Sequence, residues 1–279
     1  MHQPQTQQPP VLSAAQIEHF LQQGHVVLSD CFSREAAQEL IDDAYNRLGY
    51  DPHEASTWAK PMAYLYPSQA TPIRVFSPKL WGAICQLIGG EKRASSRDNS
   101  MGQFVINFRR GQDEPWEAPS PQLQGWHKDG RFFRHFLDSY EQGLLVIPLL
   151  TDVAHKGGAT ALATDSVPVV SRFLLHHPEG VPYHDFDFQD MVTQCHEFRE
   201  FTGSVGDVAL IHPFMLHSSM HNHSGKPRFI TNINIKLREP MNFNRANPDE
   251  YSPVEQGILR GLGVERLDFH ITSPRECEH

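Results

Sequence analysis

The first hundred residues alternate helical patterns with short connections. Three segments carry apolar residues at intervals of three and four, and each begins at a serine suited to a helix N-terminus and ends before a glycine. They run from Ser13 to Gly24, from Ser33 to Gly49 and from Ser77 to Gly89. The apolar run after the first of them, HVVLS, predicts a short strand.

From about residue 101 the pattern changes to short runs rich in Val, Ile, Phe and Thr, separated by Gly, Pro and Asp. The runs that predict strands are QFVINF, GLLVIPLL, ATALAT, VTQCHEFREF, VALIHPFML and FITNINIKL. So many short strands indicate a sandwich, jelly roll or barrel with the early helices packed outside it. The stretch from Val167 to Gly180 is typical of either a helical lid or a surface excursion, and a further helix is expected around Val254 to Leu262.

Composition narrows the class of protein. A chain of 279 residues with 39% hydrophobic residues can bury a large core, yet it has no apolar run long enough to span a bilayer. The net charge of −9 argues against nucleic acid or anionic membranes as partners. Four distant cysteines form no CxxC pair, and the Gln/Pro-rich start resembles no targeting signal, so we expect a frayed tail and a cytoplasmic protein.

Histidine is the unusual residue type, with 17 in the chain. In the segment GWHKDG, His127 and Asp129 are two residues apart, so on extended backbone both side chains point to the same face. Such a pair can bind one metal ion, although the same spacing is also typical of a surface salt bridge or a turn.

A second cluster supplies candidates for a third ligand. His212, His217, His221 and His223 lie within twelve positions, and His217 is expected at the end of an apolar strand, where a rigid scaffold meets its loop. Two histidines and one carboxylate form the facial triad that leaves open positions on Fe(II). Arg228 is expected to return beside His217 on a neighbouring strand, where its guanidinium can bind a carboxylate.

These motifs resemble the phytanoyl-CoA dioxygenase family of non-haem Fe(II)/2-oxoglutarate-dependent oxygenases. The segment SAAQIEHFLQQGHVVLSDCFSREAAQEL is similar to the family's amino-terminal helix, strand and second helix, and GWHKDG to its metal-binding His-x-Asp. The segment GSVGDVALIHPFMLHSSMHNHSGKPRF resembles the family's distal histidine, asparagine and arginine, which places His217, Asn222 and Arg228 at the matching offsets. Each motif is weak alone, whereas their order and spacing together are specific.

The resemblance implies a mainly β fold with flanking helices, a double-stranded β-helix or cupin-like jelly roll. From the resemblance together with the residue pattern, we expect one domain over residues 11–279 after a flexible tail at 1–10, with a helical part at about 11–100, a jelly-roll core at about 101–240 and an extension at 241–279. The resemblance also implies Fe(II) held by His127, Asp129 and His217, and O2 and 2-oxoglutarate as cosubstrates. Arg228 would bind the distal carboxylate of 2-oxoglutarate, with Gln124 and Thr160 as further cosubstrate contacts and no catalytic residue beyond the metal ligands.

The implied reaction is oxidation, by default hydroxylation, of a C–H bond in a small organic substrate, with succinate and CO2 as coproducts. Related halogenases have a small residue in place of the carboxylate, so Asp129 disfavours halogenation. Two alternatives stay open: a protein or peptide hydroxylase, and a non-catalytic cupin-like metal or ligand binder. Expected substrate contacts are Asn107, Arg109, Trp126, Arg131 and Phe133, for which burial in the core or solvation is the competing interpretation. We expect a monomer or homodimer.

Overall fold

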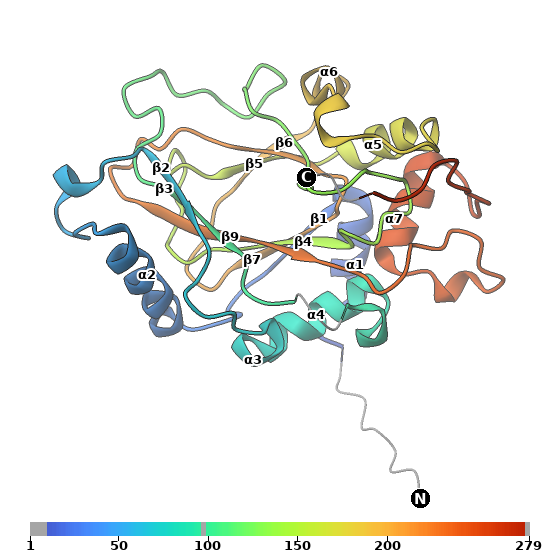
Figure 1. The fold of residues 1–279 in the computed structure, drawn as a ribbon, viewed down its shortest axis with the longest axis horizontal. Helices are drawn as coiled ribbons and strands as arrows, with labels where there is room; N and C mark the ends of the chain where they lie inside the picture. The colour runs from blue at the N-terminus through green and yellow to red at the C-terminus, as the bar shows by residue number, and fades with distance from the viewer. Residues whose placement is uncertain (1–9, 96–98, 277–279) are drawn as a thin grey trace, which may run out of the picture.

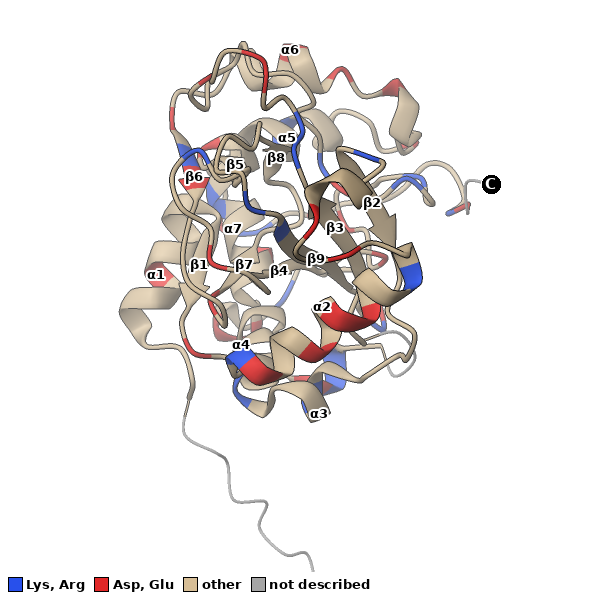
Figure 2. Ribbon diagram, turned by 90° about the vertical axis from the view of Figure 1, so that its left-hand side faces the viewer, with Lys and Arg blue, Asp and Glu red and all other residues tan. Residues whose placement is uncertain are grey.

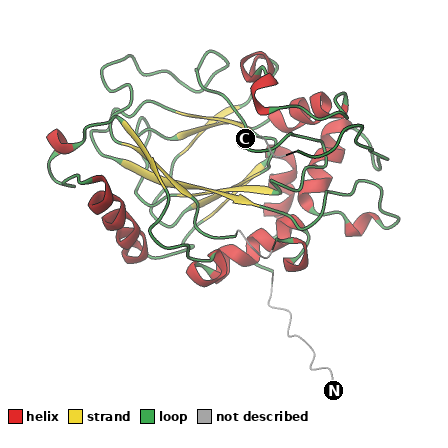
Figure 3. Cartoon of the chain, viewed as in Figure 1, coloured by secondary structure: helices red, strands yellow, loops and turns green. Residues whose placement is uncertain are grey.

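The computed structural model describes residues 10–95 and 99–276. Most of the predicted tail and Cys277 therefore lie outside the described residues. Within them the chain forms two antiparallel sheets surrounded by helices (Figures 1 and 3), so the predicted class, mainly β with flanking helices, is confirmed. The α-helices are α1 (Ala14–Gln23), α2 (Arg34–Leu48), α3 (Ile73–Phe76), α4 (Pro78–Ile88), α5 (Ser166–Leu175), α6 (Phe188–Thr193) and α7 (Pro253–Leu262). Short 3-10 helices lie at Ala55–Thr57, Glu91–Arg93, Tyr183–Asp185 and Pro248–Glu250.

The larger sheet has six strands in the order β1-β7-β4-β9-β3-β2, and the smaller has three in the order β6-β5-β8. Their bounds are β1 (His25–Leu28), β2 (Met62–Leu65), β3 (Gln103–Asn107), β4 (Leu144–Pro148), β5 (Thr160–Ala163), β6 (Phe198–Phe201), β7 (Val208–Ile211), β8 (Leu216–Ser219) and β9 (Arg228–Ile235). Because β1 and β2 join the larger sheet, the segment before residue 101 contributes strands to the roll as well as helices that cover it.

The three predicted early helices are confirmed as α1, α2 and α4. Ser13 and Gln16 form a complete capping box at α1, and Ser33 and Ser77 accept hydrogen bonds from the first turns of α2 and α4. All three helices end at a glycine in the left-handed conformation. Local sequence is sufficient to set these boundaries.

Helix α2 covers the outer face of the larger sheet through an aromatic cluster. Its Tyr45 ring lies 5.3 Å from the Phe229 ring on β9 and 6.1 Å from the ring of Phe108, which follows β3. On the opposite side of the fold α7 packs against both α1 and α5 (Figure 1). Helices therefore cover the sheets on both of these sides.

Two of the expected strands differ in the structure. The first half of VTQCHEFREF lies in or just after α6, so that β6 begins only at Phe198. The run VALIHPFML is broken at His212, and its two parts, β7 and β8, belong to different sheets. The break occurs because the His212 side chain accepts the Phe214 N–H through Nδ1, 3.1 Å away, and thereby stabilises a turn.

The predicted helix at Val254 to Leu262 is confirmed as α7, and the stretch from Val167 to Gly180 begins with α5. Val167, Val170 and Leu174 of α5 are buried in the main core. Helix α5 is therefore a packed element of the fold, and we drop the lid interpretation.

No helix in the described part of the chain is long and apolar enough to cross a membrane. Figure 2 shows Lys and Arg interspersed with Asp and Glu along the fold, with several acidic residues on α2. This distribution agrees with the net negative charge of the chain.

Candidate metal centre

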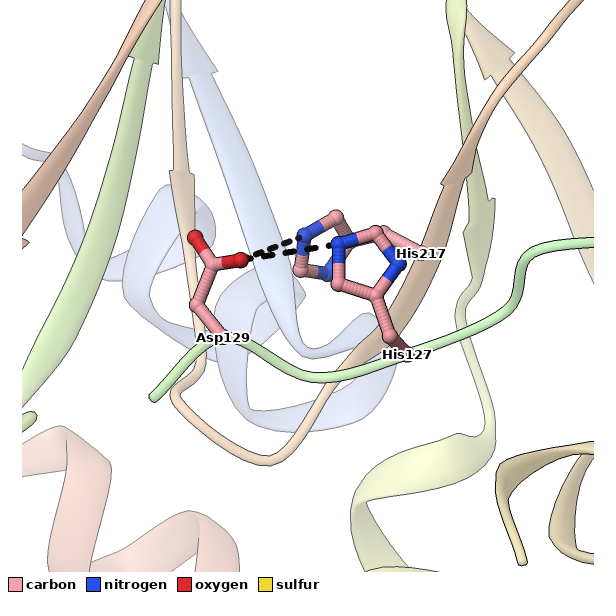
Figure 4. Close-up of side chains that lie close together, drawn as sticks. All are labelled: His127, Asp129 and His217. Atoms are coloured by element: carbon pink, nitrogen blue, oxygen red, sulfur yellow. Dashed lines mark ion pairs between the residues drawn. The ribbon is translucent and has the colours of Figure 1, made fainter. Parts of the chain in front are cut away.

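Backbone pairing places His127 and His217 opposite each other. The N–H of each residue donates to the carbonyl oxygen of the other, at 3.0 and 2.8 Å, which adds the His127 segment to the smaller sheet beside β8. Residues that pair in this way point their side chains to the same face, and the two imidazole rings lie 4.4 Å apart. Asp129, two residues further, joins them (Figure 4).

The ligand atoms of these three residues lie within 4.8 Å of one another, and no other such group of His, Cys, Asp or Glu occurs at 10–95 and 99–276. Asp129 Oδ1 is 3.5 Å from His127 Nε2 and 3.6 Å from His217 Nε2. The predicted pairing of the His-x-Asp segment with His217 is thus present in the fold.

Both histidines present Nε2 to the centre. His127 Nδ1 lies 2.8 Å from the Gly125 carbonyl oxygen and His217 Nδ1 lies 3.2 Å from that of Met215. Because a carbonyl oxygen only accepts, each Nδ1 carries a proton, so in the neutral imidazole Nε2 is the nitrogen with the free lone pair. This is the arrangement in which histidine binds metals.

The charges of the cluster favour a cation. Burial opposes ionisation of Asp129, but the neighbouring imidazoles outweigh it and hold the pKa of this carboxyl well below its usual range. Burial likewise disfavours a charged His127, but Asp129 outweighs that effect and raises the pKa of His127. His217 Nε2 is buried and has no hydrogen-bond partner in the described structure. An orphaned lone pair beside a carboxylate fits a metal ion at this position.

The remaining histidines of the second cluster lie elsewhere. His212 Nε2 is 3.1 Å from the Val254 carbonyl oxygen of α7, His221 faces Glu114 at 3.6 Å, and His223 Nε2 is 2.9 Å from the Gly111 carbonyl oxygen. His217 is also not at a strand end as expected, because it lies inside β8.

Arg228 opens β9 in the larger sheet and reaches across to the smaller one, so it is not on a strand adjacent to His217. Its Nη2 donates to Ser219 Oγ at 2.9 Å, its Nε to the Gly158 carbonyl oxygen at 2.7 Å and its Nη1 to the Val105 carbonyl oxygen at 3.3 Å. Gly158 has a φ of 74°, and a Cβ there would come within 2.7 Å of the Asn107 amide nitrogen, so the close approach requires glycine.

The Arg228 guanidinium is buried, and no described acidic side chain pairs with it. Burial, opposed by Tyr64 and reinforced by Arg110, lowers the pKa of Arg228 to about 10. Three of its five N–H groups are used by the protein, which leaves two for an anion.

The other cosubstrate candidates differ in their surroundings. Thr160 is buried on β5 and pairs directly with Ser219 of β8, so it lies across from the serine that Arg228 contacts. Gln124 is exposed, and its side chain donates to the Gln122 carbonyl oxygen.

Three of the expected substrate contacts serve the protein interior. Asn107 is buried, donates to the Met220 carbonyl oxygen and accepts from the Arg110 N–H. Trp126 donates to the Ser120 carbonyl oxygen, and Phe133 packs beside His135. Asn222, at the offset that matches the family's asparagine, donates to the carbonyl oxygens of Asn107 and Lys226 and so stabilises the loop before Arg228.

The two expected arginines differ in their surroundings. Arg131 is exposed, with its guanidinium 5.3 Å from the centre of the Tyr183 ring. Arg109 donates to the Trp58 carbonyl oxygen at 2.9 Å. Of these two arginines, Arg131 lies nearer the metal ligands in the chain, two residues after Asp129.

Two residues near the centre were not predicted as site residues from the sequence. The side chain of Lys128, between the two ligands, turns into the core, where Nζ lies 2.5 Å from His135 Nδ1, and burial lowers the pKa of Lys128 to about 7. Asn232 on β9 donates from Nδ2 to Asp129 Oδ2 at 3.2 Å. Alternation of polar and apolar residues along RFITNINI was the available signal, since it places Asn232 on the face of Arg228.

Comparison with known proteins adds the family. A sequence model of the family described as phytanoyl-CoA dioxygenase (PhyH) matches residues 9–230, whereas no curated protein matches the chain. Among solved structures, the non-heme alpha-ketoglutarate-dependent carbocyclase SnoK from nogalamycin biosynthesis is 16% identical, with 82% of this chain and 86% of SnoK covered and a TM-score of 0.52. The apoform of EctD from S. alaskensis is 20% identical, with 81% and 77% covered and a TM-score of 0.48.

The likeness to SnoK confirms the predicted cupin-like jelly roll, because it extends over most of both chains. The family model spans the two amino-terminal helices, the His-x-Asp segment and His217. The chain therefore belongs to the phytanoyl-CoA dioxygenase family, and it is a non-haem iron dioxygenase that depends on 2-oxoglutarate and O2.

Proposed function

We propose that this dioxygenase hydroxylates a C–H bond of a small organic substrate while 2-oxoglutarate and O2 are converted to succinate and CO2. The observation that carries the proposal is the convergence of His127, Asp129 and His217 on one point, with a buried, unpartnered Nε2 on His217. In the proposal these three residues hold Fe(II). The bound iron supplies the activation of O2.

Arg228 binds the distal carboxylate of 2-oxoglutarate in this proposal. Ser219, which contacts the guanidinium, lies two residues beyond His217 on the same face of β8, a separation of about 6.6 Å along the strand. A five-carbon diacid can therefore have its keto acid at the metal ligands and its other end at Arg228. Two free N–H groups on the buried cation give the carboxylate a charge-assisted pair of hydrogen bonds.

Thr160 and Gln124 complete the proposed cosubstrate site. Thr160 lies opposite Ser219 and can offer its hydroxyl to the same carboxylate. Gln124 contributes only when its side chain rotates away from Gln122, which its exposure permits.

For the substrate we propose Arg131 and Arg109 as polar contacts. The side chains of His127 and Asp129 are 31% and 25% exposed and that of His217 only 4%, so the centre opens on the side of the His-x-Asp segment that leads to Arg131. An arginine held over Tyr183 at this opening suits a substrate with an anionic group. Asn107, Trp126 and Phe133 are left out of the set because they serve the interior.

Hydroxylation is proposed over halogenation because Asp129 occupies the position of the third ligand and leaves no space there for a halide. The intact set of three ligands and a buried arginine favours turnover over a non-catalytic binder. A protein or peptide hydroxylase is the remaining alternative and is distinguished by its substrate.

We also propose a single domain over residues 11–279 and a cytoplasmic protein that is a monomer or homodimer. The compartment is supported by the cysteines, since Cys31, Cys85 and Cys195 are all free thiols.

The test is an anaerobic titration of the purified apoprotein with Fe(II) and then 2-oxoglutarate. We expect the weak visible charge-transfer band of the chelate in the wild type and its loss in His217→Ala. Absence of the band in well-folded wild type would contradict the proposed site.

Turnover is tested by succinate formation with a panel of small acids, amines and peptides, and by the mass of the product formed under ¹⁸O2. One ¹⁸O atom in a small product supports hydroxylation. Labelled peptide product instead would favour the peptide hydroxylase, and no succinate under any condition would favour the binder.

A further inference from the structure

The Asn232 side chain donates a hydrogen bond to only one of the two oxygens of the Asp129 carboxylate. Its Nδ2 lies 3.2 Å from Oδ2, whereas Oδ1 is the oxygen that lies 3.5 and 3.6 Å from the Nε2 atoms of His127 and His217. The orientation of the amide follows from chemistry, because an ionised carboxylate only accepts hydrogen bonds and so requires the NH2 group. Of the two oxygens, only Oδ1 faces both histidines (Figure 4).

The position of Asn232 is fixed by the larger sheet. It pairs with Gln103 of β3, and β9 has β4 as its neighbour on the other side, so the strand is held from both edges. Gly102, which precedes Gln103, packs so closely against the backbone of Asn232 that a Cβ there would come 1.8 Å from the Asn232 carbonyl oxygen. The donor is therefore mounted on rigid backbone, as a group that orients a ligand must be.

Asn232 also belongs to the same strand face as Arg228, four residues earlier. One strand of the larger sheet thus presents a cation to the proposed cosubstrate and an amide to the proposed metal ligand. Both side chains reach from the larger sheet to residues outside it: Arg228 contacts Ser219 of the smaller sheet, and Asn232 contacts Asp129.

We propose that Asn232 is a positioning residue that holds Asp129 as a ligand through Oδ1 alone. Without the amide, nothing described restrains Oδ2, and the carboxylate can rotate about its terminal bond so that both oxygens face the metal. A second oxygen would occupy a position that the cosubstrate needs. This inference rests on the ligand set of the proposed function.

The test uses the full-length apoprotein and Co(II), whose visible absorption reports its coordination number. Asn232→Leu removes the donor at similar volume, Asn232→Ala removes it without a steric clash, and Asn234→Ala is the matched control. Asn234 is two residues further on the same strand face, exposed, and donates to the Glu141 carbonyl oxygen. The readouts are the apoprotein melting temperature, the Co(II) affinity and the Co(II) spectrum.

We expect both Asn232 variants to bind Co(II) about 10- to 100-fold more weakly than wild type, the usual effect of removing a group that orients a ligand. Their spectra should shift toward higher coordination, and their melting temperatures should fall no further than that of Asn234→Ala. An affinity within twofold of wild type with an unchanged spectrum would overturn the inference. Failure of both apoproteins to fold would also overturn it, because Asn232 would then serve packing.

The proposed function fails in a different way. If wild type binds no Co(II), or binds it no more tightly than His217→Ala does, the proposed metal site itself is wrong. If wild type binds through His217 but the Asn232 variants match it, only the role of Asn232 is wrong.

Discussion

Arg228 is a buried cation for which the described part of the chain supplies no acidic partner. Its hydrogen-bond acceptors are two carbonyl oxygens and a hydroxyl, which carry no compensating charge, and the nearby Arg110 adds a second positive charge. Burial of a charge without a counter-ion costs free energy of folding, and a bound anion would offset this cost. The surroundings of Arg228 therefore favour the binding of an anion.

The first prediction compares two ligands on one variant. Wild type should bind 2-oxoglutarate about 10- to 100-fold more tightly than 2-oxobutanoate, which lacks the distal carboxylate, because a hydrogen bond to a charged group contributes about 1.5–3 kcal/mol. Arg228→Ala should bind both ligands with similar, weak affinity. Isothermal titration under anaerobic conditions measures this, with Arg109→Ala as control. A variant that still prefers the diacid would place the distal carboxylate elsewhere.

A second prediction concerns the ligand Asp129. Asp129→Ala should abolish hydroxylation and Fe(II) binding, whereas the apoprotein should unfold at nearly the wild-type temperature, because a ligand at an open site contributes little packing. Metal analysis and differential scanning calorimetry are the measurements. A large fall in the melting temperature would show that the carboxylate is part of the core.

At the scale of elements, the turn between β7 and β8 decides where His217 lies. His212 stabilises that turn only when neutral, since its Nδ1 accepts from Phe214 and its Nε2 donates to Val254 of α7. Burial lowers the pKa of His212 to about 3. The turn and the carboxyl-terminal helix are therefore linked through one imidazole.

This linkage predicts a pH dependence of stability. The unfolded chain binds a proton at His212 near its ordinary pKa of about 6.5, whereas the folded chain does not. The contribution of His212 is therefore fully present above that pH and is lost as the pH falls toward 3, by up to about 1.4 kcal/mol per pH unit. In urea unfolding between pH 7 and 4, His212→Asn should lose less stability than wild type. Exposed His176→Asn serves as the control, and parallel curves for His212→Asn and wild type would contradict the assignment.

At the scale of the whole molecule, Glu255 connects distant parts of the chain. It lies buried in the first turn of α7, completes a capping box with Ser252, and binds Arg93 at 2.7 Å and Arg245 at 3.0 Å. Burial disfavours its charge, but the two arginines outweigh this and lower the pKa of Glu255. The segment after the jelly roll is thereby fixed to the residues that follow α4.

Breaking this network should destabilise the entire fold. Glu255→Gln leaves two arginines beside a neutral buried amide, and removal of one partner from a buried ion pair costs about 3–5 kcal/mol. Equilibrium unfolding in urea measures the loss, and Glu239→Gln at an exposed position is the control. Equal stability of Glu255→Gln and wild type would show that solvent already screens the charges.

The sequence by itself determined the features that depend on neighbours in the chain. The serine caps and glycine ends of α1, α2 and α4 are local hydrogen-bond and dihedral preferences, so their boundaries were predicted correctly. The two-residue spacing of His127 and Asp129 also sets their common face, because side chains alternate along extended backbone.

Only the tertiary structure decided which distant residues meet. The backbone pairing of His127 with His217, the reach of Arg228 to Ser219 and the contact of Asn232 with Asp129 join segments that are 9 to 103 residues apart. The apolar run from Val208 to Leu216 looked like one strand because hydrophobic periodicity carries no information on the His212 turn that divides it. Contacts across two sheets depend on strand order and register, and these are fixed by the packing of the whole chain.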